Sequence, residues 1–177
     1  DAFTEKLDSL FVVSATESKG VDDILGRIGE YWHGNEPSHH IIFLYCYAGE
    51  PWKTQKLVHD IMKTQYGNKP NSLCGNDDCG QMSAWYIFNA MGFYPVCPGS
   101  DCYVIGRTTV RKAVMRMSNG KKFTMTAEGL SDENMYIQAA RLNGEVWNKP
   151  YLPYDEMKNG GTIVFTMGPE PNRAWGS

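Results

Sequence analysis

The hydrophobic pattern of this chain changes its period between residues 95 and 100. Before this point, apolar residues recur at the spacing of an amphipathic helix. After it, they alternate with polar residues, as in the segment 122–126, which is typical of strands with one buried face. Two periods in two separate halves predict an α+β fold. We expect helices over residues 1–97, followed by an antiparallel β-rich region over residues 98–177.

The individual elements follow from the same pattern and from its punctuation by glycine and proline. Helices are predicted over residues 3–11, 24–28, 41–45, 51–62 and 81–91. Strands are predicted over residues 102–105, 113–117, 122–126, 135–138 and 162–166, with hairpin turns at Asn119-Gly120 and Asn143-Gly144. Residues 67–75 are expected to form a loop.

Two adjacent carboxylates, Asp77 and Asp78, lie in a glycine-bracketed turn directly before the helical pattern that starts at Gln81. The free N–H groups and the dipole of a helix start keep such a carboxylate ionised. It can then accept a proton from water or bind a hard cation. An ordinary N-cap in a surface turn is the other interpretation. The spacing of an EF-hand calcium loop is absent.

A second polar block contains three histidines, one glutamate and one tryptophan within nine residues: Trp32, His33, Glu36, His39 and His40. On a helix, the adjacent His39 and His40 would point about 100° apart, so they cannot easily share one metal ion. This differs from the HExxH arrangement, in which both histidines lie on one face. Each histidine could instead be a buried imidazole with its hydrogen bonds satisfied.

These two blocks, with several others, resemble the exo-acting α-mannosidases of glycoside hydrolase family 92. The resemblance rests on residues 33–40 (HGNEPSHH), 47–55 (YAGEPWKTQ), 75–85 (GNDDCGQMSAW), 91–96 (MGFYPV), 134–138 (NMYIQ), 142–144 (LNG) and 167–176 (MGPEPNRAWG). Such enzymes carry an N-terminal β-sandwich and a catalytic (α/α)6 barrel, which implies that residues 1–97 are part of the barrel. The chain begins without an initiator methionine or a signal pattern, so we expect a C-terminal portion of a longer protein.

The resemblance implies a catalytic role for the paired carboxylates. Members of this family are calcium-dependent and invert configuration at terminal α-mannosides, and α-1,2-linked mannose in glycans is the expected substrate. Asp78 matches the general base, while a swapped or shared role for Asp77 stays open. No block matches the general acid, which lies on an earlier barrel segment. Glu36 is the only other strong carboxylate candidate for the general acid, but we favour a metal-binding or substrate-binding role for it. We therefore expect the chain to be inactive alone and to need the missing N-terminal part of the same protein as a partner.

The resemblance also implies a cofactor and a sugar pocket. Asn35 and Glu36 are expected to supply oxygen ligands to Ca²⁺, directly or through water. Trp32, His33 and His39 are expected to line the pocket, with Glu36 as a further substrate-binding residue. A member of this family is expected outside the cytoplasm, in the periplasm, at the cell surface or secreted.

Composition restricts the other possibilities. A net charge of −3 gives no electrostatic reason to bind nucleic acid or an anionic membrane. No apolar run approaches the ~20 residues of a membrane-spanning helix. The pairs Cys74–Cys79 and Cys97–Cys102 each follow the spacing C-x4-C, which leaves zinc as a minor alternative to disulfides or free thiols.

Two other functions are compatible with parts of the sequence. Residues 100–177 could form a non-catalytic carbohydrate-binding or structural β module. Asn76, Asp77 and Asp78 could form a structural ion loop in a calcium-binding interaction domain. The polar blocks in the helical half argue against the first alternative as a complete description, because a simple sugar-binding module does not need them.

Overall fold

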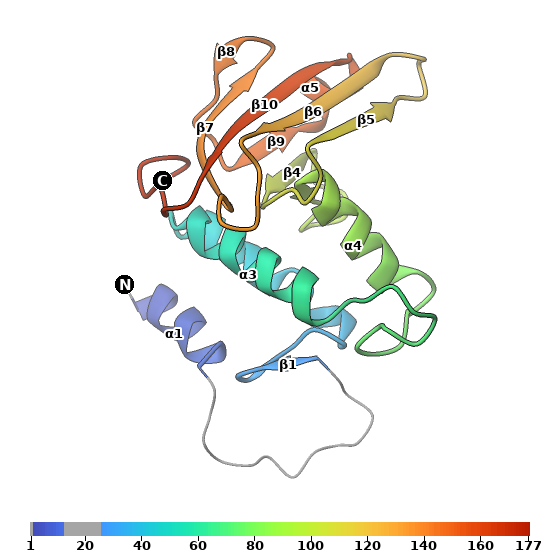
Figure 1. The fold of residues 1–177 in the computed structure, drawn as a ribbon, viewed down its shortest axis with the longest axis vertical. Helices are drawn as coiled ribbons and strands as arrows, with labels where there is room; N and C mark the ends of the chain where they lie inside the picture. Colours follow the sequence, from blue (N-terminus) through green and yellow to red (C-terminus); the bar gives the residue numbers. More distant parts are fainter. Residues whose placement is uncertain (1, 13–25) are drawn as a thin grey trace.

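The structure is a computed structural model that describes residues 2–12 and 26–177. A layer of helices lies beneath a twisted β-sheet (Figure 1). The helices are α1 (Ala2–Leu10), η1 (Glu36–Ser38), η2 (Ile41–Phe43), α2 (Leu44–Tyr47), α3 (Pro51–Thr64), α4 (Gln81–Met91) and α5 (Tyr154–Lys158). The strands are β1 (Arg27–Ile28), β2 (Tyr31–Trp32), β3 (Phe93–Tyr94), β4 (Cys102–Ile105), β5 (Lys112–Arg116), β6 (Lys122–Glu128), β7 (Tyr136–Leu142), β8 (Glu145–Val146), β9 (Tyr151–Pro153) and β10 (Gly161–Gly168).

The two longest helices lie close to their predicted bounds, although α3 continues two residues beyond Met62 to Thr64. Helix α3 starts at Pro51, whose fixed φ suits the first helical position. Helix α4 ends at Met91, and the next residue, Gly92, has φ +99° and so closes the helix in the left-handed conformation. The segment 41–45 is helical as predicted, although its first turn is the tighter 3₁₀ helix η2.

The helix predicted over residues 24–28 is absent from the part of that segment that the structure describes, residues 26–28. Ile24 and Leu25 lie outside the described residues, and Ile28 belongs to strand β1. Gly29 has φ +61° and allows a tight turn into β2, in which Ile28 pairs with Tyr31. The glycine therefore favours a short hairpin over a continued helix.

The main sheet has the strand order β5-β6-β10-β7-β8, and a smaller sheet has the order β3-β4-β9. The β-rich region is antiparallel in all of its pairs but one, since β10 is parallel to β6 and antiparallel to β7. Both predicted hairpin turns are present. At the second, Asn143 and Gly144 both have positive φ, which matches the twist of the flanking strands.

Two buried clusters meet between the helices and the sheet. One centres on the sheet and includes Phe123 and Phe165. The other lies among the helices and includes Phe43 and Trp85. A buried hydrogen bond of 2.8 Å also joins the layers, because Oε1 of Gln55 on α3 accepts the N–H of Ile137 on β7. No helix in the described part of the chain is both long enough and apolar enough to cross a membrane.

Candidate active site

The turn before α4 holds three consecutive residues in the left-handed conformation. Asp78 has φ +49°, Cys79 has φ +57° and Gly80 has φ +94°. Only glycine adopts this conformation without steric cost, so the two preceding residues store backbone strain. Strain of this kind persists where the surrounding structure holds it, and it is concentrated at functional sites.

Asp77 supplies the hydrogen bonds that hold this turn. Its Oδ1 accepts from both the N–H and the hydroxyl of Ser83, each at 3.0 Å. Its carbonyl oxygen accepts from the N–H groups of Gly80 at 3.1 Å and Met82 at 3.2 Å. Asp77 therefore satisfies free N–H groups at the start of α4, as a cap does.

Asp78 is placed differently from its neighbour. Its side chain is exposed and its carboxylate accepts no hydrogen bond within residues 2–12 and 26–177. Only its carbonyl oxygen is used, by the N–H of Gln81 at 3.2 Å. One carboxylate of the pair thus has a structural partner, and the other is available to a ligand or a water molecule.

His39 connects the upstream polar block to α4. Its Nε2 lies 2.9 Å from the carbonyl oxygen of His33, and its Nδ1 lies 3.3 Å from Nε2 of Gln81. A carbonyl oxygen can only accept and an amide nitrogen only donates. The proton of neutral His39 is therefore on Nε2. The amide nitrogen of Gln81 also donates to the hydroxyl of Tyr94 at 3.0 Å.

His33 takes part in a second hydrogen-bonded chain, and its protonation follows from its partners. The Tyr66 hydroxyl donates to the carbonyl oxygen of Met82 at 3.1 Å, so it accepts from Nε2 of His33 at 2.8 Å. Nδ1 of His33 then accepts from the Tyr31 hydroxyl at 2.9 Å. Burial, together with the neighbouring His39, lowers the pKa of His33 to about 3. The ring is neutral at ordinary pH.

The two polar blocks also touch through their backbones. A Cβ atom at Gly75 would lie 2.8 Å from the carbonyl oxygen of Gly34 and 2.9 Å from its Cα atom. No side chain fits between the loops at these distances. The two blocks therefore lie against one another in this part of the molecule.

The predicted ligand and pocket residues divide into exposed and buried sets. Asn35 and Glu36 are exposed, and Trp32 is half-buried with the guanidinium of Arg27 5.4 Å from its ring centre. His33 and His39 are almost fully buried, with exposed fractions of 0% and 1%. The buried pair lies behind the surface, in a position to orient other residues.

Glu36 and Asp78 are both near His39. Burial lowers the pKa of the His39 imidazole, while the charges of these two carboxylates act in the opposite direction. Both acids are therefore close enough to influence the same ring.

The donor chemistry of the upstream block suits calcium only in part. The exposed oxygens of Asn35 and Glu36 are of the hard type that Ca²⁺ binds, but two side chains cannot supply its six to eight ligands. Within the described residues, no group of three or more His, Cys, Asp or Glu side chains is placed to hold a metal ion. All five cysteines are free thiols, so the C-x4-C pairs form neither a zinc cluster nor disulfides here.

Sequence reasoning missed three residues of this region. Gln81 stands in the motif of residues 75–85 and could have been suspected from that position. Tyr94 likewise stands in the motif of residues 91–96, and its hydroxyl accepts from the amide of Gln81. Tyr66 lies in a loop outside these motifs, and nothing in its local pattern indicates contact with a buried histidine.

The profile of the glycosyl hydrolase family 92 catalytic domain matches residues 1–169. The chain belongs to this family. An uncharacterized secreted glycosidase of Arthroderma benhamiae is 33% identical to it over 147 residues, which is 81% of this chain and 19% of that protein.

Solved structures of family 92 agree closely with this fold. A family 92 α-mannosidase of Bacteroides thetaiotaomicron, in complex with mannoimidazole, has a TM-score of 0.93 and 48% identity. The match covers 98% of this chain and 23% of that one. An inverting family 92 mannosidase of the same organism has a TM-score of 0.84 and 39% identity, over 98% of this chain and 25% of that one. This family 92 chain thus spans about a quarter of the length of these two enzymes.

Proposed function

We propose that this chain is the C-terminal part of a calcium-dependent, inverting exo-α-mannosidase that hydrolyses terminal α-mannosides of glycans, with α-1,2 linkages as the expected substrate. Residues 1–97 would belong to the catalytic barrel and residues 98–177 to the region that follows it. The observation that carries the proposal is the contrast within the acidic pair. Asp77 caps α4, while the strained, exposed Asp78 has an unused carboxylate. The mannoimidazole bound by the similar α-mannosidase supports a mannoside as substrate.

In this proposal Asp78 is the general base. An inverting glycosidase places two carboxyl groups roughly 6.5–9.5 Å apart, so that a water molecule fits between the base and the anomeric carbon. The Asp78 carboxylate accepts a proton from that water as its oxygen attacks the sugar. The Asp77 cap and the left-handed run of the turn would hold the backbone that carries this base. The general acid, which protonates the leaving oxygen, comes from the part of the protein that precedes this chain.

Asn35 and Glu36 are the residues of this chain that would hold calcium. The bound ion would interact with hydroxyl groups of the terminal mannose and favour a distorted ring. The remaining ligand positions would be filled by water and by substrate, which agrees with a donor set that is incomplete within the chain.

The buried histidines act as positioning residues in this proposal. His39 is held between the backbone of His33 and the amide of Gln81, so it links the calcium block to the start of α4. Trp32, which is half-buried, offers its ring to the sugar. The name of the Arthroderma relative, a secreted glycosidase, supports a location outside the cytoplasm.

The experiment that tests the base compares Asp78→Asn with Asp77→Asn in the full-length protein. Asp78→Asn should lower kcat on an α-mannoside by about 10²–10⁴-fold, with affinity for mannose little changed. Asp77→Asn keeps an oxygen that can accept from Ser83, so its kcat should stay within about tenfold of the parent. Near-full turnover by Asp78→Asn would refute the assignment. Mannoside binding without turnover in the parent protein would favour a non-catalytic module.

A further inference from the structure

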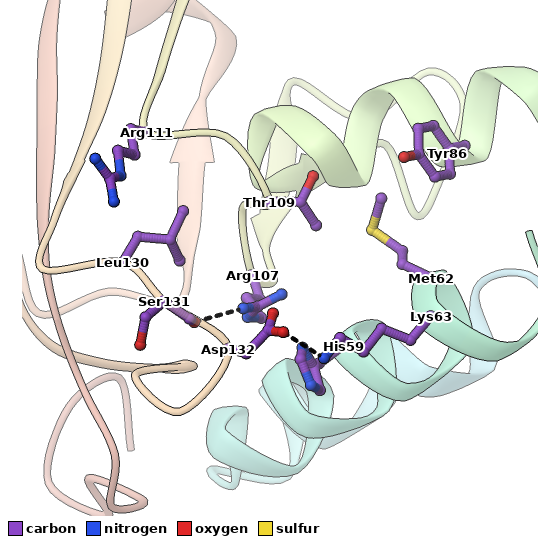
Figure 2. A pocket seen from close by; sticks show the side chains of 10 residues that line it. All are labelled: His59, Met62, Lys63, Tyr86, Arg107, Thr109, Arg111, Leu130, Ser131 and Asp132. Atoms are coloured by element: carbon purple, nitrogen blue, oxygen red, sulfur yellow. Dashed lines mark hydrogen bonds and ion pairs between the residues drawn. The ribbon is translucent and has the colours of Figure 1, made fainter. Parts of the chain in front are cut away.

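A pocket of about 310 Å³ lies where α3 and α4 meet the loops around residues 107–111 and 130–132 (Figure 2). None of its lining residues belongs to the two polar blocks of the candidate active site. The pocket therefore needs an explanation of its own.

Arg107 is the central polar residue of this pocket and is only 4% exposed. One guanidinium nitrogen, Nη2, donates to the carbonyl oxygen of Ser131 at 3.1 Å. The Nε atom is buried and has no hydrogen-bond partner. No carboxylate of the described residues lies within ion-pair distance of this guanidinium. Arginine is almost never buried in this way unless an anion accompanies it.

His59, on α3, is a second buried polar group with an unused atom. Its side chain is 7% exposed and its Nδ1 has no partner. Burial lowers the pKa of His59, and the charges of Arg107 and Lys63 lower it further. A bound anion would offset these positive charges, which disfavour the protonated form of the ring.

The charges around the pocket do not balance. Lys63, Arg107 and Arg111 supply three positive charges, and Asp132 is the one carboxylate among the lining residues. That carboxylate already pairs with Lys63 at 2.8 Å (Figure 2). Arg107 and Arg111 are left without an acidic partner in the part of the chain that the structure describes.

We propose that this pocket binds a small tetrahedral oxyanion, either free phosphate or sulfate or an ester of one of them. The guanidinium groups of Arg107 and Arg111 would bind its oxygens, since the arginine fork matches phosphate geometry. His59 would donate a further hydrogen bond. Thr109, whose hydroxyl has no partner within the described residues, also lines the pocket. The proposal does not depend on the mannosidase assignment, because the two sites share no residue.

The test is a titration of the full-length protein with inorganic phosphate at a constant ionic strength set with sodium chloride. Isothermal calorimetry measures the binding, and thermal unfolding measures the stabilisation. Phosphate should bind saturably and raise the unfolding temperature, and sulfate should compete with it. Arg107→Gln and Arg111→Gln should each weaken phosphate binding by at least about tenfold. Arg111 is exposed, so its replacement tests the site without disturbing the core.

Arg116→Gln is the matched control, since it removes the same charge from an exposed position on β5 outside the pocket. This variant should bind phosphate as the parent does. Absence of saturable binding in the parent would overturn the proposal, as would an equal loss in Arg111→Gln and Arg116→Gln. A structure of the full-length protein with one of its own carboxylates paired to Arg107 would also overturn it.

Discussion

Replacement of Tyr66 by phenylalanine tests the buried chain that joins the two polar blocks. The Tyr66 hydroxyl accepts from Nε2 of His33 and donates to the carbonyl oxygen of Met82. Without it, the His33 N–H is left buried with no acceptor, because His33 has no exposed surface. The aromatic ring and its parallel stacking on Trp85 remain in the variant.

The magnitude follows from these two hydrogen bonds. A buried donor without a partner costs about 1–3 kcal/mol, and an ordinary hydrogen bond contributes about 0.5–1.5 kcal/mol. The Met82 carbonyl loses less, since it also lies within helix α4. We therefore expect Tyr66→Phe to lower the free energy of unfolding by about 2 kcal/mol. For a unit of about 150–250 residues that unfolds cooperatively, this corresponds to a fall of about 4–8 °C in the unfolding temperature.

The assay is thermal and urea unfolding of the full-length protein, followed by near-ultraviolet circular dichroism. Tyr86→Phe is the matched control, because Tyr86 on α4 is 40% exposed and its hydroxyl has no hydrogen bond within the described chain. That variant should differ from the parent by less than about 0.5 kcal/mol. Equal stability of the two variants would refute the assigned network.

Three further predictions concern other features. Burial lowers the pKa of His33 from 6.5 to about 3. Between pH 6.5 and about pH 3, the imidazole therefore binds a proton in the unfolded chain but not in the folded chain. The unfolding temperature should therefore fall as pH falls through this window, and a constant value from pH 6.5 to 4 would contradict a neutral, buried ring. Gly75→Ala should destabilise the protein by about 1–3 kcal/mol in urea unfolding, since the new methyl group clashes with the backbone of Gly34, and a loss below 0.5 kcal/mol would contradict the close approach of the loops. Chelation should abolish α-mannosidase activity of the full-length protein, calcium should restore it better than zinc, and Glu36→Gln should need more calcium; full activity after dialysis against EDTA would exclude the proposed metal role.

Local patterns predicted the elements whose ends carry their own chemical signals. Pro51 and Gly92 mark ends of the two long helices, and the alternation of residues 122–126 identifies β6. The short helix α5 and the strands β3, β8 and β9 were not predicted. The three strands have two or three residues each and α5 has five, little more than one helical turn, so neither a strand period nor a helix period repeats within them.

Long-range relations could not be predicted in the same way. The place of β10 between β6 and β7 depends on pairing over many residues, and its parallel pair has no signature in a single strand. Burial of the histidines was one of two alternatives that the sequence left open, because a histidine does not reveal its partners. Distinguishing Asp77 from Asp78 needed the hydrogen bonds to Ser83.

The position of β10 has a consequence for how the protein is made. Synthesis runs from the N-terminus, so β5 and β6 leave the ribosome first and β7 and β8 follow, each pair able to form its own hairpin. Until residues 161–168 emerge, nothing bridges the two hairpins, and each presents an unpaired edge. The nascent sheet is then open to pairing with other chains. Strand β10 ends this exposure, because it pairs with the free edges of both β6 and β7.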